Sequence, residues 1–232
     1  MVALDVDRLG PACALARQLR GAAGLFKVGS QLFTAEGPRS VEKLARLGFG
    51  VFLDLKFHDI PNTVAGAVEA AASLPKVRLI TLHASGGLAM MRAAREAVAG
   101  KKNRPALLGI TVLTSLDAPA LRRIGISGSP GTRALALARL AKEAELDGVV
   151  ASAHEAEAIR MACGPKFLIV VPGVRPASAS LNDQSRVATP AEAIQAGANY
   201  LVVGRPITKA ENPRRAALDI SEEIASAQPS PR

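Results

Sequence analysis

The chain has 232 residues, of which 49% are hydrophobic and 3% aromatic, and its formal net charge is +9. This length suits one large domain or two small ones, with a core of small aliphatic side chains. No apolar run approaches the ~20 residues of a membrane-spanning helix, which excludes that class of membrane protein. Cys13 and Cys163 lie far apart and form neither a disulfide framework nor a metal motif. No signal peptide precedes the first apolar run, so we expect a protein of the reducing cytoplasm.

The positive charge has two interpretations. One is nucleic-acid binding. Against it, the Lys and Arg residues are scattered along the chain, with no dense basic run and no aromatic residues between them to stack on bases. A small anionic substrate needs only a few of these charges. We therefore expect a small-molecule substrate and no nucleic-acid partner, with most of the charge on a solvated surface.

Apolar runs alternate with helical patterns from one end of the chain to the other. Runs typical of buried strands are found at 2–6, 25–29, 51–53, 77–83, 105–113, 148–150, 167–171 and 200–203. Apolar residues at helical spacing, often closed by glycine, predict helices around 12–19, 41–45, 64–74, 86–100, 116–124, 137–144, 154–162 and 190–196.

Eight strands alternating with helices predict a single parallel (β/α)₈ TIM barrel over residues 1–232. A doubly wound open sheet is the alternative, but no Gly-x-Gly-x-x-Gly pattern follows any strand. The segment 173–189, rich in Ser, Pro and Asn, is long for a connection and is expected to be a mobile lid. The tail beyond 228 is expected to be disordered.

Charged residues gather where the third predicted strand ends. Asp54 and Lys56 share one face of that strand if its side chains alternate regularly, and Asp59 follows just beyond it. A structural ion pair is one explanation, because buried charges are costly unless they are paired. One Asp and one Lys would suffice for such a pair. The second Asp therefore points to a functional site.

The run 54–63, Asp-Leu-Lys-Phe-His-Asp-Ile-Pro-Asn-Thr, resembles the signature of the bacterial orotidine 5′-phosphate decarboxylase family. Its core pattern, Asp-x-Lys-x-x-Asp, also occurs in hexulose-phosphate synthase and ketogulonate-phosphate decarboxylase, but the continuation 58–63 resembles the nucleotide enzyme. The resemblance implies a homodimeric enzyme that decarboxylates orotidine 5′-phosphate to UMP and CO₂. This reaction is the last step of pyrimidine nucleotide synthesis, and the family uses no metal or cofactor for it.

The last two predicted strands have similar endings, Pro-Gly-Val-Arg-Pro at 172–176 and Val-Gly-Arg-Pro at 203–206. TIM barrels often bind phosphate at this place. Gly204 would let the backbone approach an anion, and Arg205 offers it a planar fork of donors. Turn formation alone explains the Gly and Pro residues but not both arginines. We therefore predict a phosphate site there.

The family resemblance assigns roles to individual residues. The charged catalytic network is matched by Lys27, Asp54, Lys56 and Asp59, with Lys56 as the proton donor to C6 and Asp54 beside the leaving carboxylate. The remaining substrate contacts that the resemblance implies are ribose contacts from Asp5 and Lys27, a base contact from Thr114, a phosphate grip from Arg175, Gln184, Gly204 and Arg205, and further contacts from Asn62 and Thr63. The resemblance also implies that Asp59 serves the neighbouring subunit's site.

Two other function classes fit parts of the pattern. A metal-dependent sugar-phosphate lyase or aldolase would use the same barrel but would need Mg²⁺. His58 and His83 could be metal ligands, but no His-x-x-x-His or Cys pair supports that role. We expect both histidines in the wall of the site. A non-catalytic nucleotide- or nucleic-acid-binding protein is the third class, and it would not turn over orotidylate.

Overall fold

The computed structural model describes residues 1–176 and 188–227. These residues form one parallel sheet of eight strands in chain order. The strands are β1 (Val2–Ala3), β2 (Leu25–Gly29), β3 (Gly50–Phe57), β4 (Val77–His83), β5 (Ala106–Ile110), β6 (Gly148–Val150), β7 (Leu168–Pro172) and β8 (Tyr200–Val202). A parallel bridge between Val2 and Val203 joins the first and last strands and closes the sheet. The prediction of a TIM barrel is confirmed, and the open doubly wound sheet is excluded.

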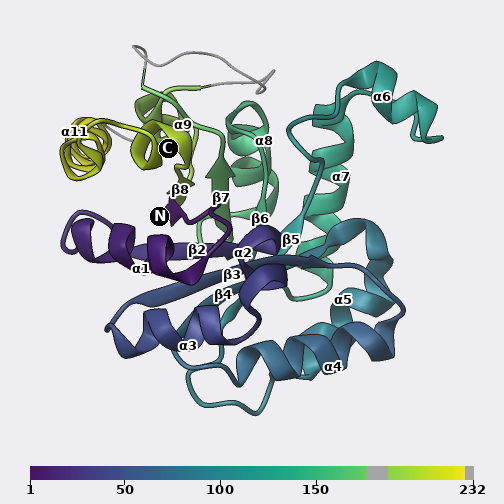
Figure 1. Ribbon diagram of the computed structural model, residues 1–232. Helices are drawn as coiled ribbons and strands as arrows, with labels where there is room; N and C mark the ends of the chain where they lie inside the picture. Colours follow the sequence, from purple (N-terminus) through teal and green to yellow (C-terminus); the bar gives the residue numbers. More distant parts are fainter. Residues whose placement is uncertain (177–187, 228–232) are drawn as a thin grey trace.

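Helices surround the barrel in Figure 1. They are α1 (Leu9–Gln18), α2 (Ser30–Glu36), α3 (Arg39–Arg46), α4 (Pro61–Ala72), α5 (Gly87–Glu96), α6 (Ala118–Arg123), α7 (Pro130–Glu143), α8 (Ala153–Cys163), α9 (Pro190–Gln195), α10 (Arg205–Thr208) and α11 (Pro213–Ser226), with a 3₁₀ turn at Ala84–Gly86. Of these, α6 stands away from the sheet, beyond α7. None of the described helices is long and apolar enough to cross a lipid bilayer.

Several elements differ from the predicted ones. The helices α2, α10 and α11 were not predicted, and β3 continues past Leu53 to Phe57. The first strand is shorter than predicted because the Val6 N–H bonds to the Leu4 carbonyl, which turns the chain out of the sheet. Most of the predicted lid over 173–189, namely residues 177–187, lies outside the described part of the chain. The predicted disordered tail beyond 228 lies outside it as well. Both stay predictions.

The two faces of the barrel sheet carry different apolar layers. Inside the barrel lies a compact cluster of Ala3, Phe52, Leu79, Leu108, Val170 and Val202. A much larger cluster fills the space between strands and helices and includes Leu4, Val28, Leu53, Ile80 and Leu107. Side chains alternate along a strand, so residues two positions beyond the interior cluster also face the interior. This alternation aims Lys27, Asp54 and Thr81 towards the carboxyl end of the barrel, two positions after Leu25, Phe52 and Leu79, whereas Asp5 lies beyond the end of β1.

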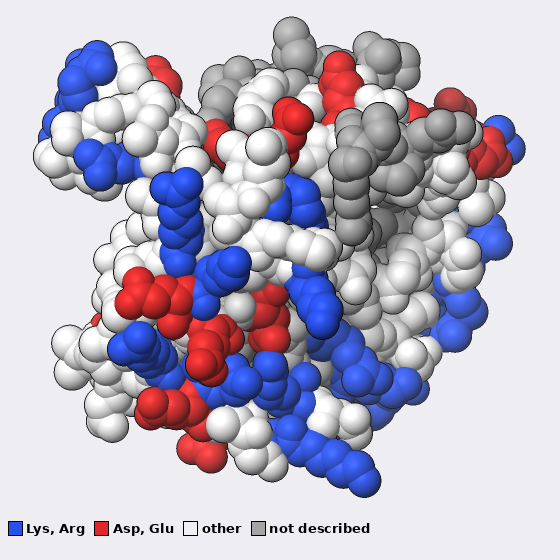
Figure 2. All heavy atoms as spheres, turned by 180° about the vertical axis from the view of Figure 1, so that it is seen from behind, with Lys and Arg blue, Asp and Glu red and all other residues white. Residues whose placement is uncertain are grey.

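The charges on one face of the molecule are mixed in sign. On the face shown in Figure 2, Lys and Arg side chains extend across the lower half, and Asp and Glu side chains lie among many of them. Mixed charge of this kind suits a solvated surface. The expectation that the chain has no nucleic-acid partner stays a prediction.

An ion pair ties β5 to β6 at the amino-terminal end of the barrel. The Asp147 carboxylate accepts hydrogen bonds from both terminal nitrogens of Arg104, at 2.7 Å each. It also accepts the backbone N–H of Leu107 at 2.7 Å. Charge-assisted, bidentate geometry of this kind is stronger than an ordinary surface ion pair. The interaction therefore holds the end of the barrel that lies opposite the charged residues.

We predict that Asp147→Ala lowers the free energy of unfolding by about 2 kcal/mol, because it strands the Arg104 charge and the Leu107 N–H. The melting temperature should fall by roughly 4–8 °C in thermal unfolding of a chain this long. Asp219→Ala is the control, since Asp219 forms an exposed pair with Arg215 on α11. It should cost less than about 0.5 kcal/mol. Equal melting temperatures for the two variants would contradict the proposed role of Asp147.

Candidate active site

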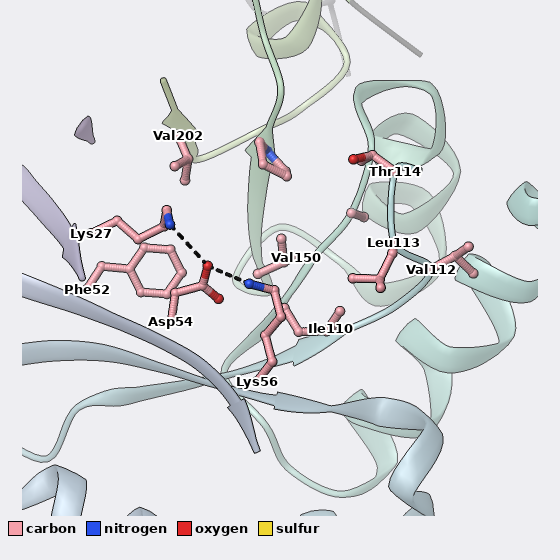
Figure 3. Close-up of a pocket in the computed structure, with 12 residues that line it drawn as sticks. Lys27, Phe52, Asp54, Lys56, Ile110, Val112, Leu113, Thr114, Val150 and Val202 are labelled. Carbon is pink, nitrogen blue, oxygen red and sulfur yellow. Dashed lines mark hydrogen bonds and ion pairs between the residues drawn. The ribbon is translucent and has the colours of Figure 1, made fainter. Parts of the chain in front are cut away.

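The Asp54 carboxylate lies between two lysines at the carboxyl end of the barrel (Figure 3). Its Oδ2 atom is 2.7 Å from Lys56 Nζ and 3.5 Å from Lys27 Nζ. Lys27 Nζ is also 3.0 Å from Asp5 Oδ1. The Asp54 side chain is only 9% exposed, whereas that of Asp5 is 53% exposed. A chain of alternating charges thus runs from the surface into the barrel.

The pKa of Asp54 reflects this environment. Burial alone would raise the pKa, but the charges of Lys56 and Lys27 and hydrogen bonds from Lys56 and Thr81 outweigh it. The net effect is a pKa below the ordinary value for Asp. Asp54 is therefore ionised at neutral pH.

Lys56 reaches this position through an irregular backbone. Its φ angle is +53°, in the left-handed region that residues other than glycine rarely adopt. The pairing of β3 with β4 shifts here, from Leu53 opposite Ile80 to Phe57 opposite Leu82. Regular strand alternation predicts Asp54 and Lys56 on one face of β3. Both do reach the cavity, but Lys56 does so within a bulge.

A cavity of about 210 Å³ opens beside these charges. Lys27, Asp54 and Lys56 lie on one side of it, and Thr114 lies in its wall. The remaining wall is mainly apolar, formed by Phe52, Ile110, Val112, Leu113, Val150, Ala151, Pro172 and Val202. Such a cavity suits a flat ring with polar groups on one edge, because the apolar wall can pack against the ring while the charged residues bind its polar edge.

A second cavity, of about 420 Å³, adjoins the first. Lys27, Pro172 and Val202 line both cavities. The predicted phosphate residues Arg175, Gly204 and Arg205 line the second one, together with Asp5 and Lys209. Arg175 is 5% exposed, so its guanidinium is largely withdrawn from water. Two guanidinium groups and two ammonium groups around one hollow suit an anion such as a phosphate monoester.

Three predicted site residues lie apart from both cavities. Asp59, Asn62 and Thr63 are exposed, at the end of β3 and in the first turn of α4. The Asp59 carboxylate accepts the N–H of Ile60 at 2.6 Å, and no ion pair joins it to another residue of the described ranges. Ile60 itself is 66% exposed. Gln184 lies outside the described residues.

The two histidines of the motif region lie side by side, with the ring centres of His58 and His83 separated by 5.1 Å. Burial is the main reason why the pKa of His83 is lowered, and the charges of His58 and Lys56 add to it. Across residues 1–176 and 188–227, no group of three or more His, Cys, Asp or Glu side chains is placed to hold a metal ion. Neither histidine is among the residues that line the two cavities, so their expected place in the wall of the site stays a prediction.

One buried polar residue of the site, Thr81, was not predicted from the sequence. The Thr81 hydroxyl donates to Asp54 Oδ1 at 2.9 Å and accepts the Lys56 N–H at 2.9 Å. A signal was available, because Thr81 interrupts the apolar run of β4 two positions after the interior residue Leu79. The apolar wall residues were missed too, since nothing in the sequence distinguishes them from other core residues.

Comparison with known proteins places the chain in a family. Residues 1–220 match the sequence model of the Orotidine 5'-phosphate decarboxylase / HUMPS family. The chain is 54% identical over 227 residues to orotidine 5'-phosphate decarboxylase of Halorhodospira halophila, covering 98% of this chain and 96% of that protein. It is 52% identical over 226 residues to the enzyme of Nitrosococcus oceani, covering 97% of each.

A solved structure agrees with these sequence matches. The crystal structure of orotidine 5'-phosphate decarboxylase from Lactobacillus acidophilus superimposes with a TM-score of 0.83 at 35% sequence identity, covering 97% of this chain and 98% of that chain. Its similarity extends over the whole barrel, so the match does not depend on the 54–63 motif alone. The chain therefore belongs to the orotidine 5′-phosphate decarboxylase / HUMPS family.

Proposed function

We propose that this protein decarboxylates orotidine 5′-phosphate to UMP and CO₂, the last step of pyrimidine nucleotide synthesis, in the cytoplasm. The observation that carries the proposal is the Asp54 carboxylate held by Lys56 and Lys27 at the edge of a mainly apolar cavity. The adjoining cationic cavity supports a phosphorylated substrate. Relatives about half identical to the chain that bear the name of this enzyme support the choice of reaction.

The two cavities suggest how the nucleotide binds. The pyrimidine would occupy the first cavity, with Thr114 beside the base. The phosphate would lie in the second, against Arg175, Gly204 and Arg205. Lys27, at the junction of the cavities, and Asp5, 3.0 Å from Lys27 Nζ, would bind the ribose hydroxyls. The roles of Gln184 in the phosphate grip and of Asn62 and Thr63 in substrate binding rest on the family resemblance.

The chemistry requires stabilisation of negative charge at C6 of the pyrimidine. When the bond to the carboxylate breaks, its electron pair stays on C6 and CO₂ leaves. The Lys56 ammonium would stabilise the growing charge and then transfer its proton to C6, so that the charge is neutralised without any cofactor. Asp54 would lie next to the substrate carboxylate, a like-charge contact that ends as CO₂ departs. Lys27 would hold Asp54 in place.

The phosphate lies far from the reacting carbon but still contributes to catalysis. Binding energy from a remote group can favour the transition state when it orients the reacting part of the substrate. Because the two cavities adjoin, a phosphate bound in the second would hold the base of the same nucleotide beside Asp54 and Lys56 in the first.

Asp59 is proposed to act across a homodimer. It is exposed and lines neither cavity of its own chain, yet it belongs to the charged motif. Its exposure, next to the exposed apolar Ile60, supports a position at a subunit interface. The partner subunit's Asp59 would then lie near Lys56 and help to keep it protonated.

The test of the proposed function is to follow orotidylate absorbance with the purified protein in the presence of EDTA. Turnover that continues with the chelator supports decarboxylation by the side chains alone. Turnover that the chelator abolishes would instead mean that a bound metal ion takes part in the reaction, and a metal-dependent sugar-phosphate enzyme would not turn over orotidylate at all. A folded protein without turnover, but with salt-sensitive binding to DNA or RNA, would favour a non-catalytic role.

Lys56→Ala should fold yet lose nearly all turnover, because it removes both the charge facing C6 and the proton donor. The loss should appear in kcat far more than in ligand binding. Lys76→Ala is the matched control, since Lys76 is also a lysine with a left-handed φ, of +57°. It is exposed and directly precedes β4, at the end of the barrel opposite the charged residues, so its loss should leave kcat unchanged. Retention by Lys56→Ala of more than roughly a tenth of wild-type kcat would rule out Lys56 as the donor.

Arg205→Ala should chiefly impair use of the phosphorylated substrate. Orotidine, which lacks the phosphate, should be a very poor substrate for both wild type and variant, and the variant should process it about as well as wild type does. Steady-state kinetics with both substrates measure this difference. Arg215→Ala, which removes an exposed arginine of α11, should affect neither substrate. An equal slowing of both substrates by Arg205→Ala would mean that Arg205 does not bind phosphate.

The dimer proposal is tested by mixing two inactive variants, Lys56→Ala and Asp59→Ala. If each site combines Lys56 of one chain with the partner subunit's Asp59, a mixed dimer has one doubly altered site and one native site. Random exchange makes about half the dimers mixed, so roughly a quarter of all sites should regain activity. The assay is orotidylate turnover before and after exchange, with mass tags on the two chains to confirm it. No recovery after confirmed exchange would place Asp59 outside the partner's site.

A further inference from the structure

Thr81 connects β4 to the charged cluster through a single hydroxyl group. The residue is fully buried, at 0% exposure. Its Oγ1 atom lies 2.9 Å from Asp54 Oδ1 and 2.9 Å from the backbone nitrogen of Lys56. A hydroxyl has one proton to donate and lone pairs to accept with. The proton therefore goes to the ionised Asp54 carboxylate, and a lone pair accepts the Lys56 N–H.

This bridge stands where the ladder between β3 and β4 is interrupted. The register changes between the pair Leu53–Ile80 and the pair Phe57–Leu82, which leaves Thr81 opposite the irregular stretch. Within that stretch Lys56 has its φ of +53°. A buried N–H without a partner is costly, and here the Thr81 side chain accepts the hydrogen bond instead of a strand carbonyl. The hydroxyl thus stabilises a backbone conformation that a lysine rarely adopts.

We propose that Thr81 is a positioning residue for the decarboxylation, an inference that rests on the proposed function. One hydroxyl fixes both the orientation of the Asp54 carboxylate and the backbone from which the Lys56 ammonium extends. Thr81 is not among the residues that line either cavity. It therefore acts through Asp54 and Lys56, and not by touching the substrate.

Loss of the Thr81 hydroxyl should lower the rate of decarboxylation far more than it weakens binding of the substrate. Loss of the hydroxyl leaves the contacts around Arg175 and Arg205 unchanged, so the phosphate should bind as before. The relative position of the carboxylate and the ammonium is lost, and displacements of about 1 Å at reacting groups can reduce a rate by roughly 100-fold. Burial raises the pKa of Asp54, and the charges of Lys56 and Lys27 lower it. The hydrogen bond from Thr81 also lowers that pKa. Its removal should raise that pKa.

The test compares Thr81→Val, which keeps the shape but removes the hydroxyl, with Thr81→Ser, which keeps the hydroxyl. In Thr81→Val we expect kcat for orotidylate to fall about 10- to 100-fold, with KM changed less than about threefold. Thr81→Ser should recover most of the loss. Ser40→Ala, which removes a fully buried hydroxyl bonded to the Gly37 carbonyl, should leave kcat unchanged. Circular dichroism confirms the folded state of each variant.

A second measurement does not depend on turnover. Titration of the Asp54 carboxyl by carbon-13 NMR should give a higher pKa in Thr81→Val than in wild type or Thr81→Ser. If wild type fails to decarboxylate orotidylate, the proposed function is wrong, and this titration still tests the bridge. Wild-type kcat together with an unchanged Asp54 titration in Thr81→Val would overturn the positioning role. Equal damage from Thr81→Ser and Thr81→Val would overturn it too. If Thr81→Val does not fold, Thr81→Ala replaces it with the same expectations.

Discussion

The site depends on one buried carboxylate with two ammonium groups beside it. Asp54 is almost fully withdrawn from water, and an ionised group in that position would be very costly without partners. Lys27 from β2, Lys56 from β3 and Thr81 from β4 supply those partners. Three neighbouring strands must therefore converge at one level. A parallel barrel provides this convergence, because every strand ends on the same rim.

The layer beneath the charges strengthens their effect. Phe52, Leu79, Leu108 and Val170 fill the barrel interior and exclude water from below Asp54. Charges that act over an apolar floor interact more strongly than charges in water, because the local dielectric constant is lower. The same alternation of side chains that builds this floor aims Lys27, Asp54 and Thr81 at the space above it. Packing and electrostatics of the site thus follow from one strand periodicity.

Much of this arrangement could be predicted from the sequence, and the exceptions have physical reasons. The bounds of β2, β4 and β6 coincide with the predicted runs, because Val, Ile, Leu and Phe make up most of each run and favour a buried strand. Helix α11 carried recognisable signals, an Asn212 cap and Pro213 in its first turn, yet it was not predicted. The bulge at Lys56 has no sequence signal, since lysine has no preference for a left-handed backbone.

Some residues of the candidate site could be placed from the sequence, and others could not. Strand ends meet on one rim, so the barrel itself brings Asp5, Lys27, Asp54, Arg175 and Arg205 to the two adjoining cavities. Asp59, Asn62 and Thr63 are exposed, and their proposed roles depend on a second chain or on the family resemblance. Thr81 could have been found by asking which polar residue shares the interior face of β4 with Leu79.

The shared wall between the two cavities has a consequence for ligand design. Lys27 contributes to both hollows, so a group in one hollow that draws the Lys27 ammonium towards itself changes the charge that a group in the other hollow meets. The free energies of binding of a base fragment and of a phosphate fragment should therefore not be independent. By thermodynamic reciprocity, each fragment changes the affinity of the other by the same factor. An inhibitor assembled from two such fragments would gain or lose affinity through one lysine before its linker contributes anything.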